Sequence, residues 1–209
     1  MFIDVLKSLI AGIIAAAPFG PVLVLVLQKT MRHGRWAGFC TGLGSSLADT
    51  IYAAIGLFTL GLVSTFIQTH QELMHIVGGS ILLIVGMLVW RKDAELMTDT
   101  PETHFTKAGY GVQACFCALS NPTALAFMMA LLFFLKLDSA TIRCPIWLSL
   151  LAVFAGETVY WFVVTGVVNR YVHLKPRYLK WMSSIAGIGV SVIGIFLIVR
   201  GIIMIYNGQ

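Results

Sequence analysis

Two acidic residues, Asp49 and Glu157, stand alone in the middle of two long apolar segments. An ionised carboxylate at the centre of a bilayer costs roughly 2.5–3.5 kcal/mol on the mildest scales, so intramembrane acids are expected to be functional. Burial away from water favours the protonated form of a carboxylic acid. Such a group can take up a proton from one side of a membrane and release it to the other. It can also bind an ammonium group or a cation.

A tyrosine follows each acid by three residues, at Tyr52 and Tyr160. On a helix this spacing places acid and tyrosine on the same face. The phenolic hydroxyl is able to donate a hydrogen bond to the carboxylate, so we include both tyrosines in the predicted site. The alternative is that each acid is protonated and only bonds a neighbouring helix.

Helix-breaking residues occur about ten to thirteen residues into the first and fourth apolar segments. They are Pro18, Gly20 and Pro21 in the first segment, and Asn121 and Pro122 in the fourth. Proline removes a backbone donor and clashes with the preceding turn. Backbone groups freed in this way cannot face lipid and must be buried in protein or line a cavity. We therefore predict that both breaks shape a site, although a simple packing kink is the alternative.

The elements that must position these residues are membrane helices. Hydrophobic residues make up 58% of the 209 and charged residues only 11%, well away from soluble domains. Six apolar segments approach or exceed the ~20 residues that cross a bilayer. They cover residues 8–28, 36–71, 73–90, 108–135, 144–169 and 181–199. We predict an all-α integral membrane protein with six transmembrane helices, of which helices 1 and 4 are broken.

The chain has the pattern of an internal repeat. Ala-Asp-Thr-Ile-Tyr at residues 48–52 and Gly-Glu-Thr-Val-Tyr at residues 156–160 are 108 positions apart. The same offset aligns Gly79 with Gly187, Gly86 with Gly194 and Lys92 with Arg200. We predict a first three-helix repeat at residues 1–92, a cytoplasmic linker at 93–107 and a second repeat at 108–209. Three crossings per half make the repeat inverted, which favours a substrate site near the midplane where the halves meet.

The net charge of +5 is better explained by topology than by nucleic-acid binding, and no nucleic-acid partner is predicted. Residues 28–35, 91–107 and 170–180 fall on one side of the predicted membrane and contain ten of the 14 Lys and Arg. Positively charged loops stay in the cytoplasm, which places both termini outside. A cleaved signal peptide is disfavoured because the first apolar segment is too long for one.

No metal, cofactor or enzyme site is predicted. The histidines lack the spacing of metal ligands, no cofactor motif is present, and Ser45, Ser46 and Ser120 have no neighbouring histidine to activate them. Most tryptophans lie at segment ends, whereas Trp161 follows Glu157 by one turn and could face a cavity. Glycines at 34, 38 and 42 favour close helix packing, and a homodimer face is left open as an alternative.

Several motifs together resemble the lysine exporter / homoserine-threonine exporter (LysE/RhtB) family of bacterial amino-acid translocators. They are Pro-Phe-Gly-Pro at 18–21, Gly-Arg-x-x-Gly-Phe-x-x-Gly-Leu-Gly at 34–44, Ala-Asp-x-x-Tyr at 48–52, and Gly-x-x-x-Gln at 109–113 leading to Asn-Pro at 121–122. The resemblance covers nearly the whole chain. It departs at Thr123, where the family has a lysine, and that puts the substrate in doubt. It implies efflux of amino acids or similar small zwitterions across the bacterial inner membrane, driven by the proton-motive force.

The leading hypothesis is therefore a proton-coupled amino-acid exporter with Asp49 and Glu157 at its centre. Its partners would be a small-molecule substrate, protons and the lipid bilayer. The alternative is a divalent-cation exporter, because paired carboxylates and carbonyls suit hard, oxygen-ligated metals. Two acids make a sparse site for such a metal, since hard-metal sites usually recruit more carboxylates.

Overall fold

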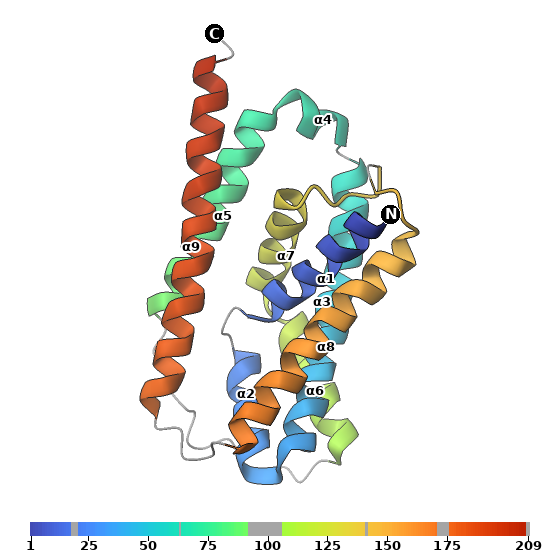
Figure 1. The fold of residues 1–209 in the computed structure, drawn as a ribbon, viewed down its shortest axis with the longest axis vertical. Helices are drawn as coiled ribbons and strands as arrows, with labels where there is room; N and C mark the ends of the chain where they lie inside the picture. Colours follow the sequence, from blue (N-terminus) through green and yellow to red (C-terminus); the bar gives the residue numbers. More distant parts are fainter. Residues whose placement is uncertain (18–20, 63, 92–105, 141, 171–175, 208–209) are drawn as a thin grey trace.

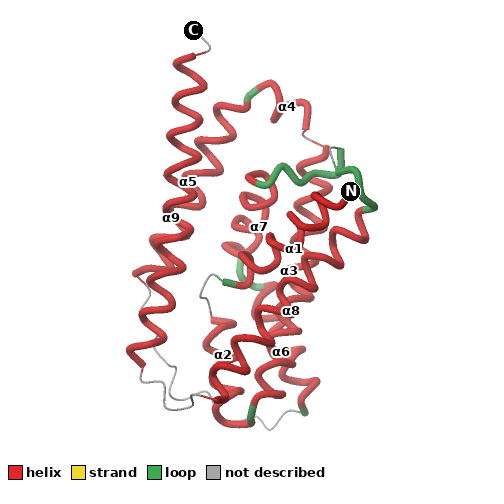
Figure 2. The backbone as a smooth tube through the Cα atoms, in the orientation of Figure 1, coloured by secondary structure: helices red, strands yellow, loops and turns green. Residues whose placement is uncertain are grey.

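The computed structural model describes the chain except residues 18–20, 63, 92–105, 141, 171–175 and 208–209. Every regular element in the described part is a helix (Figures 1 and 2). The elements are α1 (Phe2–Ala16), α2 (Pro21–His33), α3 (Arg35–Leu62), α4 (Ser64–Thr69), α5 (Gln71–Arg91), α6 (Lys107–Leu119), α7 (Pro122–Phe134), α8 (Ile146–Arg170) and α9 (Pro176–Asn207). The predicted all-α class is confirmed for these residues.

Four helices are long and apolar enough to cross a membrane, namely α3, α5, α8 and α9. Helices α6 and α7 together make a fifth candidate span, bent by 75° at its break. The first predicted crossing corresponds to α1 and α2, and Pro18 and Gly20 between them lie outside the described residues. The described part thus contains four to five candidate spans, against the six that the sequence predicts.

Helix α3 lies at the centre of the arrangement and contacts α2, α6, α7 and α8 (Figure 1). Helix α1 packs along α8, and α6 packs along α3. Helices α5 and α9 form an antiparallel pair at the left of the view, and α5 joins this pair to the rest of the molecule through α7. The central position of α3 and its contact with α8 bring the two acid-bearing helices together.

Glycine allows two pairs of helix backbones to touch. A Cβ atom added at Gly12 on α1 would collide with the carbonyl of Val153 on α8. A Cβ atom added at Gly44 on α3 would collide with the carbonyl of Gly111 on α6. Small residues commonly allow this close approach between membrane helices. Each contact thus joins one of the acid-bearing helices, α8 or α3, to a shorter helix.

The stripe at Gly34, Gly38 and Gly42 is mainly an internal packing surface. A side chain at Gly38 would meet Thr30 and the Val26 carbonyl of α2, and one at Gly42 would meet the indole of Trp161 on α8. Gly34 instead has a φ of +85° and lets α3 begin one residue after α2 ends. The packing interpretation is confirmed at Gly38 and Gly42, and the dimer-face alternative is wrong for these two positions, because other helices of the same chain cover them.

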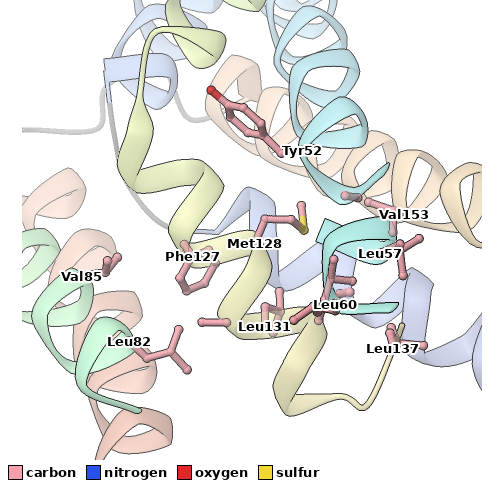
Figure 3. Close-up of a cluster of buried hydrophobic side chains, with 14 of the residues drawn as sticks. Tyr52, Leu57, Leu60, Leu82, Val85, Phe127, Met128, Leu131, Leu137 and Val153 are labelled. Atoms are coloured by element: carbon pink, nitrogen blue, oxygen red, sulfur yellow. The ribbon is translucent and has the colours of Figure 1, made fainter. Parts of the chain in front are cut away.

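The main hydrophobic cluster joins α7 to α3 on one side and to α5 on the other (Figure 3). Met128 and Leu131 of α7 are fully buried next to Leu57 of α3, while Leu82 of α5 packs from the opposite side. Large apolar side chains also cover the outer surface, notably along α9, where Val192 is 58% exposed. An apolar exterior of this kind suits contact with lipid.

Candidate functional site

The two acids lie on neighbouring helices, Asp49 on α3 and Glu157 on α8, and the helices pack against each other. The carboxylates are close enough to interact electrostatically. Asp49 is half-buried, and the Ser45 hydroxyl donates to its Oδ2 at 3.3 Å. The fold therefore brings together the two acids that the sequence places 108 residues apart.

Glu157 is fully buried, and neither of its carboxyl oxygens has a hydrogen-bond partner. Ser46 of α3 lies beside it, but the Ser46 hydroxyl donates to the Gly42 carbonyl at 3.1 Å. A buried polar group without a partner costs roughly 1–3 kcal/mol, and more when it is charged. Such a group in a native structure is often reserved for a ligand or for a proton.

Tyr52 contacts the broken helix rather than the acid that precedes it in the sequence. Its hydroxyl donates to the Leu119 carbonyl at 2.7 Å and lies 3.3 Å from the Ala118 carbonyl. These carbonyls belong to the last turn of α6, whose acceptors have no partner within the helix. The hydrogen bond to the carboxylate that the sequence allowed is thus replaced by a bond that caps α6. The Leu119 carbonyl needs this donor more than the Asp49 carboxylate does, since an unpaired carbonyl at the break would have no water to accept from.

Replacing Tyr52 with Phe is expected to destabilise the fold by about 1–3 kcal/mol, because the Leu119 carbonyl would lose its donor. The loss can be measured from denaturant unfolding of the purified protein in detergent. Tyr206→Phe is the matched control, since Tyr206 is 82% exposed at the end of α9. Equal stability of the two variants would show that the Tyr52 hydroxyl does not stabilise the break.

Tyr160 follows Glu157 at the same spacing as Tyr52 follows Asp49. It packs against a second hydrophobic cluster that includes Ala16, the last residue of α1, and Leu23 of α2. Its ring meets the ring of Trp161 edge-on at 5.2 Å between centroids. Tyr160 therefore lies near the break in the first span, as Tyr52 lies near the break in the fourth.

The break between α6 and α7 is organised by Asn121. Its side-chain Oδ1 accepts from the backbone N–H of Thr123 at 3.2 Å and from the Thr123 hydroxyl at 2.6 Å. Asn121 is thus the N-cap of α7, and Pro122 follows at the first helical position, where a missing N–H is harmless. Helix α7 consequently begins at the bend. Thr123, in place of the cation expected from the family pattern, fixes the Asn121 amide.

Of the residues predicted to break the first span, the structure describes Pro21. Pro21 begins α2, as proline often begins a helix. Pro18 and Gly20 lie outside the described residues. The roles proposed for these residues therefore stay predictions.

Three polar residues of α3 were not in the predicted site. Ser45 and Ser46 contact the acids as described above. Arg35, at the start of α3, donates from Nη2 to the Phe162 carbonyl of α8 at 3.4 Å and stacks on the Phe162 ring at 4.2 Å. The sequence contained a signal for Arg35, because the 108-residue offset pairs it with Arg143, just before α8.

Trp161, for which the sequence suggested a place facing a cavity, is only 2% exposed. Its indole packs against Gly42 of α3 and against Leu23 and Val26 of α2. The indole Nε1 is buried without a hydrogen-bond partner. As for metals, the described residues contain no group of three His, Cys, Asp or Glu side chains that could hold an ion.

Comparison with known proteins identifies the family of the chain. The chain is 28% identical over 196 residues to "Uncharacterized membrane protein YahN" of Escherichia coli (strain K12), covering 90% of this chain and 83% of that protein. It is 22% identical over 205 residues to "Putative amino acid efflux protein YcgF" of Bacillus subtilis (strain 168), covering 94% and 96%. No solved structure matches significantly. The sequence model that describes LysE type translocators matches residues 13–201, which include both acids and both breaks. The chain therefore belongs to the LysE type translocator family.

Proposed function

We propose that the protein is a secondary active exporter of amino acids or similar small zwitterions, working by proton antiport. The substrate site lies between α3 and α8, around Asp49 and Glu157, near the bilayer midplane. Family membership and the amino-acid efflux described in the name of the Bacillus subtilis relative support the substrate class.

The observation that carries the proposal is the fully buried Glu157 carboxyl group, which has no partner and lies next to a second acid. Two carboxylates this close resist ionising together, so the pair favours sharing a proton. An ammonium group arriving at Glu157 satisfies the carboxylate and displaces the proton. Substrate and proton then exclude each other, and this exclusion couples their movements in opposite directions.

The proposed architecture has six crossings in two inverted repeats, residues 1–92 and 108–209, joined by the linker at 93–107. Exchanging the halves turns the α1–α8 pair into the α6–α3 pair, and both pairs form extensive contacts. The α3–α8 and α5–α9 pairs each map onto themselves. This pattern supports a two-fold relation between the halves, with the substrate site on its axis.

The distribution of Lys and Arg supports a cytoplasmic location for the α2–α3 connection and both termini outside. In a bacterium, helical spans of this kind belong in the cytoplasmic, or inner, membrane. Substrate would then enter beside Arg35, which begins α3, and leave beside Asp4, which accepts from the backbone N–H of Arg143 just before α8 begins.

The test is efflux from proteoliposomes loaded with each of the twenty labelled amino acids, with and without an imposed pH gradient. We expect gradient-dependent efflux of at least one of them. Efflux of Mn²⁺ without any amino acid would replace this proposal with the divalent-cation alternative. Movement of neither class would contradict both.

A further inference from the structure

The polar side-chain atoms that are buried without a partner gather on two helices. In the described part of the chain they are both carboxyl oxygens of Glu157, the indole Nε1 of Trp161 and the Nε of Arg35. Glu157 and Trp161 belong to α8, and Arg35 belongs to α3 and touches α8. Native proteins leave few buried polar groups unpaired. Their concentration at one helix interface indicates a place prepared for a ligand.

Glu157 and Trp161 are four residues apart on the buried face of α8. At this spacing, side chains lie one above the other, with Cβ atoms about 5–6 Å apart. Glu157 is 0% and Trp161 2% exposed, and both side chains are directed into the protein. A carboxylate that can accept and an N–H that can only donate thus occupy adjacent positions in one dry interface.

A positive charge lies where α3 begins, at Arg35, and its sign is opposite to that of the acids. The guanidinium of Arg35 lies over the Phe162 ring and within 3.3 Å of the position of a Cβ added at Gly166, so it lies beyond Trp161 along α8 as seen from Glu157. A guanidinium group carries a positive charge and only donates hydrogen bonds. The order along α8 is therefore acid, indole donor and cation. This order suits a molecule with a positive group at one end and a negative group at the other.

We propose that the indole N–H of Trp161 binds the carboxylate of the substrate while Glu157 binds its ammonium group. The site then selects amino carboxylates over amines and metal cations, which offer nothing to an N–H donor. The charge of Arg35 attracts the carboxylate toward the Trp161 end and sets the orientation of the substrate. The inference rests on the proposed exporter function and adds the group that recognises the acid end of the substrate.

The experiment uses the amino acid that the wild-type protein exchanges fastest in proteoliposomes, and the corresponding amine without the carboxylate. Inhibition of counterflow gives the apparent affinity of each compound. For Trp161→Phe we expect affinity for the amino acid to fall about 10- to 100-fold, which is the loss expected for one hydrogen bond to a charged group. Affinity for the amine should stay unchanged. Trp147→Phe is the matched control on the same helix, because Trp147 is 63% exposed.

A second substitution separates the N–H from the shape of the ring. Replacing Trp161 with benzothienylalanine puts sulfur in place of N–H and nearly preserves the volume, so the packing on Gly42 is retained. The same selective loss for the amino acid supports the proposal. Full retention of affinity, or an equal loss for acid and amine, overturns it. If the wild-type protein exchanges no amino acid, the proposed exporter function itself fails.

Discussion

Substrate counterflow by the Glu157→Gln variant is expected to be about 100-fold or more slower than that of the wild-type protein. Glutamine keeps the size of the side chain but carries neither a negative charge nor an exchangeable acidic proton. The substrate ammonium would then be buried without its counter-charge. Removing one partner of a buried ion pair costs about 3–5 kcal/mol, and each 1.4 kcal/mol is a factor of ten. The measurement is exchange of labelled amino acid between two equal pools, without any pH gradient.

Glu72→Gln is the matched control for this substitution. Glu72 begins α5, away from the α3–α8 interface, so the same chemical change there should leave counterflow intact. If Glu157→Gln exchanged substrate as fast as the wild-type protein, Glu157 would be a structural acid and the central part of the proposed mechanism would be wrong.

Asp49→Asn is expected to have a different effect, abolishing the response to a pH gradient while leaving counterflow largely intact. Asp49 is half-buried and accepts a hydrogen bond from Ser45, and an asparagine oxygen can accept the same bond. The substitution therefore preserves the local geometry and removes the negative charge together with the exchangeable proton. We assign to Asp49 the exchange with water of the proton that the pair shares, because Asp49 is the more exposed of the two acids. Efflux with and without an outside-acid gradient measures the coupling.

Asp138→Asn is the control for Asp49→Asn. The Asp138 carboxylate accepts from the Ala140 backbone N–H in the loop after α7, a bond that asparagine also makes. Its gradient response should equal that of the wild-type protein. Loss of both counterflow and coupling in Asp49→Asn, as in Glu157→Gln, would mean that the two acids act as one unit and that their roles cannot be divided.

At the break between α6 and α7, the sequence predicts the position of the break and the tertiary structure determines its hydrogen-bond donor. Pro122 announces the break, because proline cannot continue a helix. The sequence could not reveal which group satisfies the freed carbonyl of Leu119, because the donor is Tyr52, 67 residues away. The spacing of three residues on one helix made Asp49 the expected partner of Tyr52. The hydroxyl instead donates to a carbonyl of α6, because a carbonyl within a membrane has no water from which to accept a hydrogen bond.

The sequence by itself determined the membrane class, the all-helical fold and the family, and it predicted the depth of the acids and the internal repeat. All of these are properties of residue type and spacing along one chain, and apolar length and helical periodicity express them directly. Only the tertiary structure decided that Glu157 is unpartnered beside Asp49, that the glycine stripe faces α2 and α8, and that Trp161 is buried one turn from Glu157. These facts depend on which helix faces touch and how closely their backbones approach. Contacts between helices more than 100 residues apart are fixed by packing of the whole chain, and no local pattern encodes them.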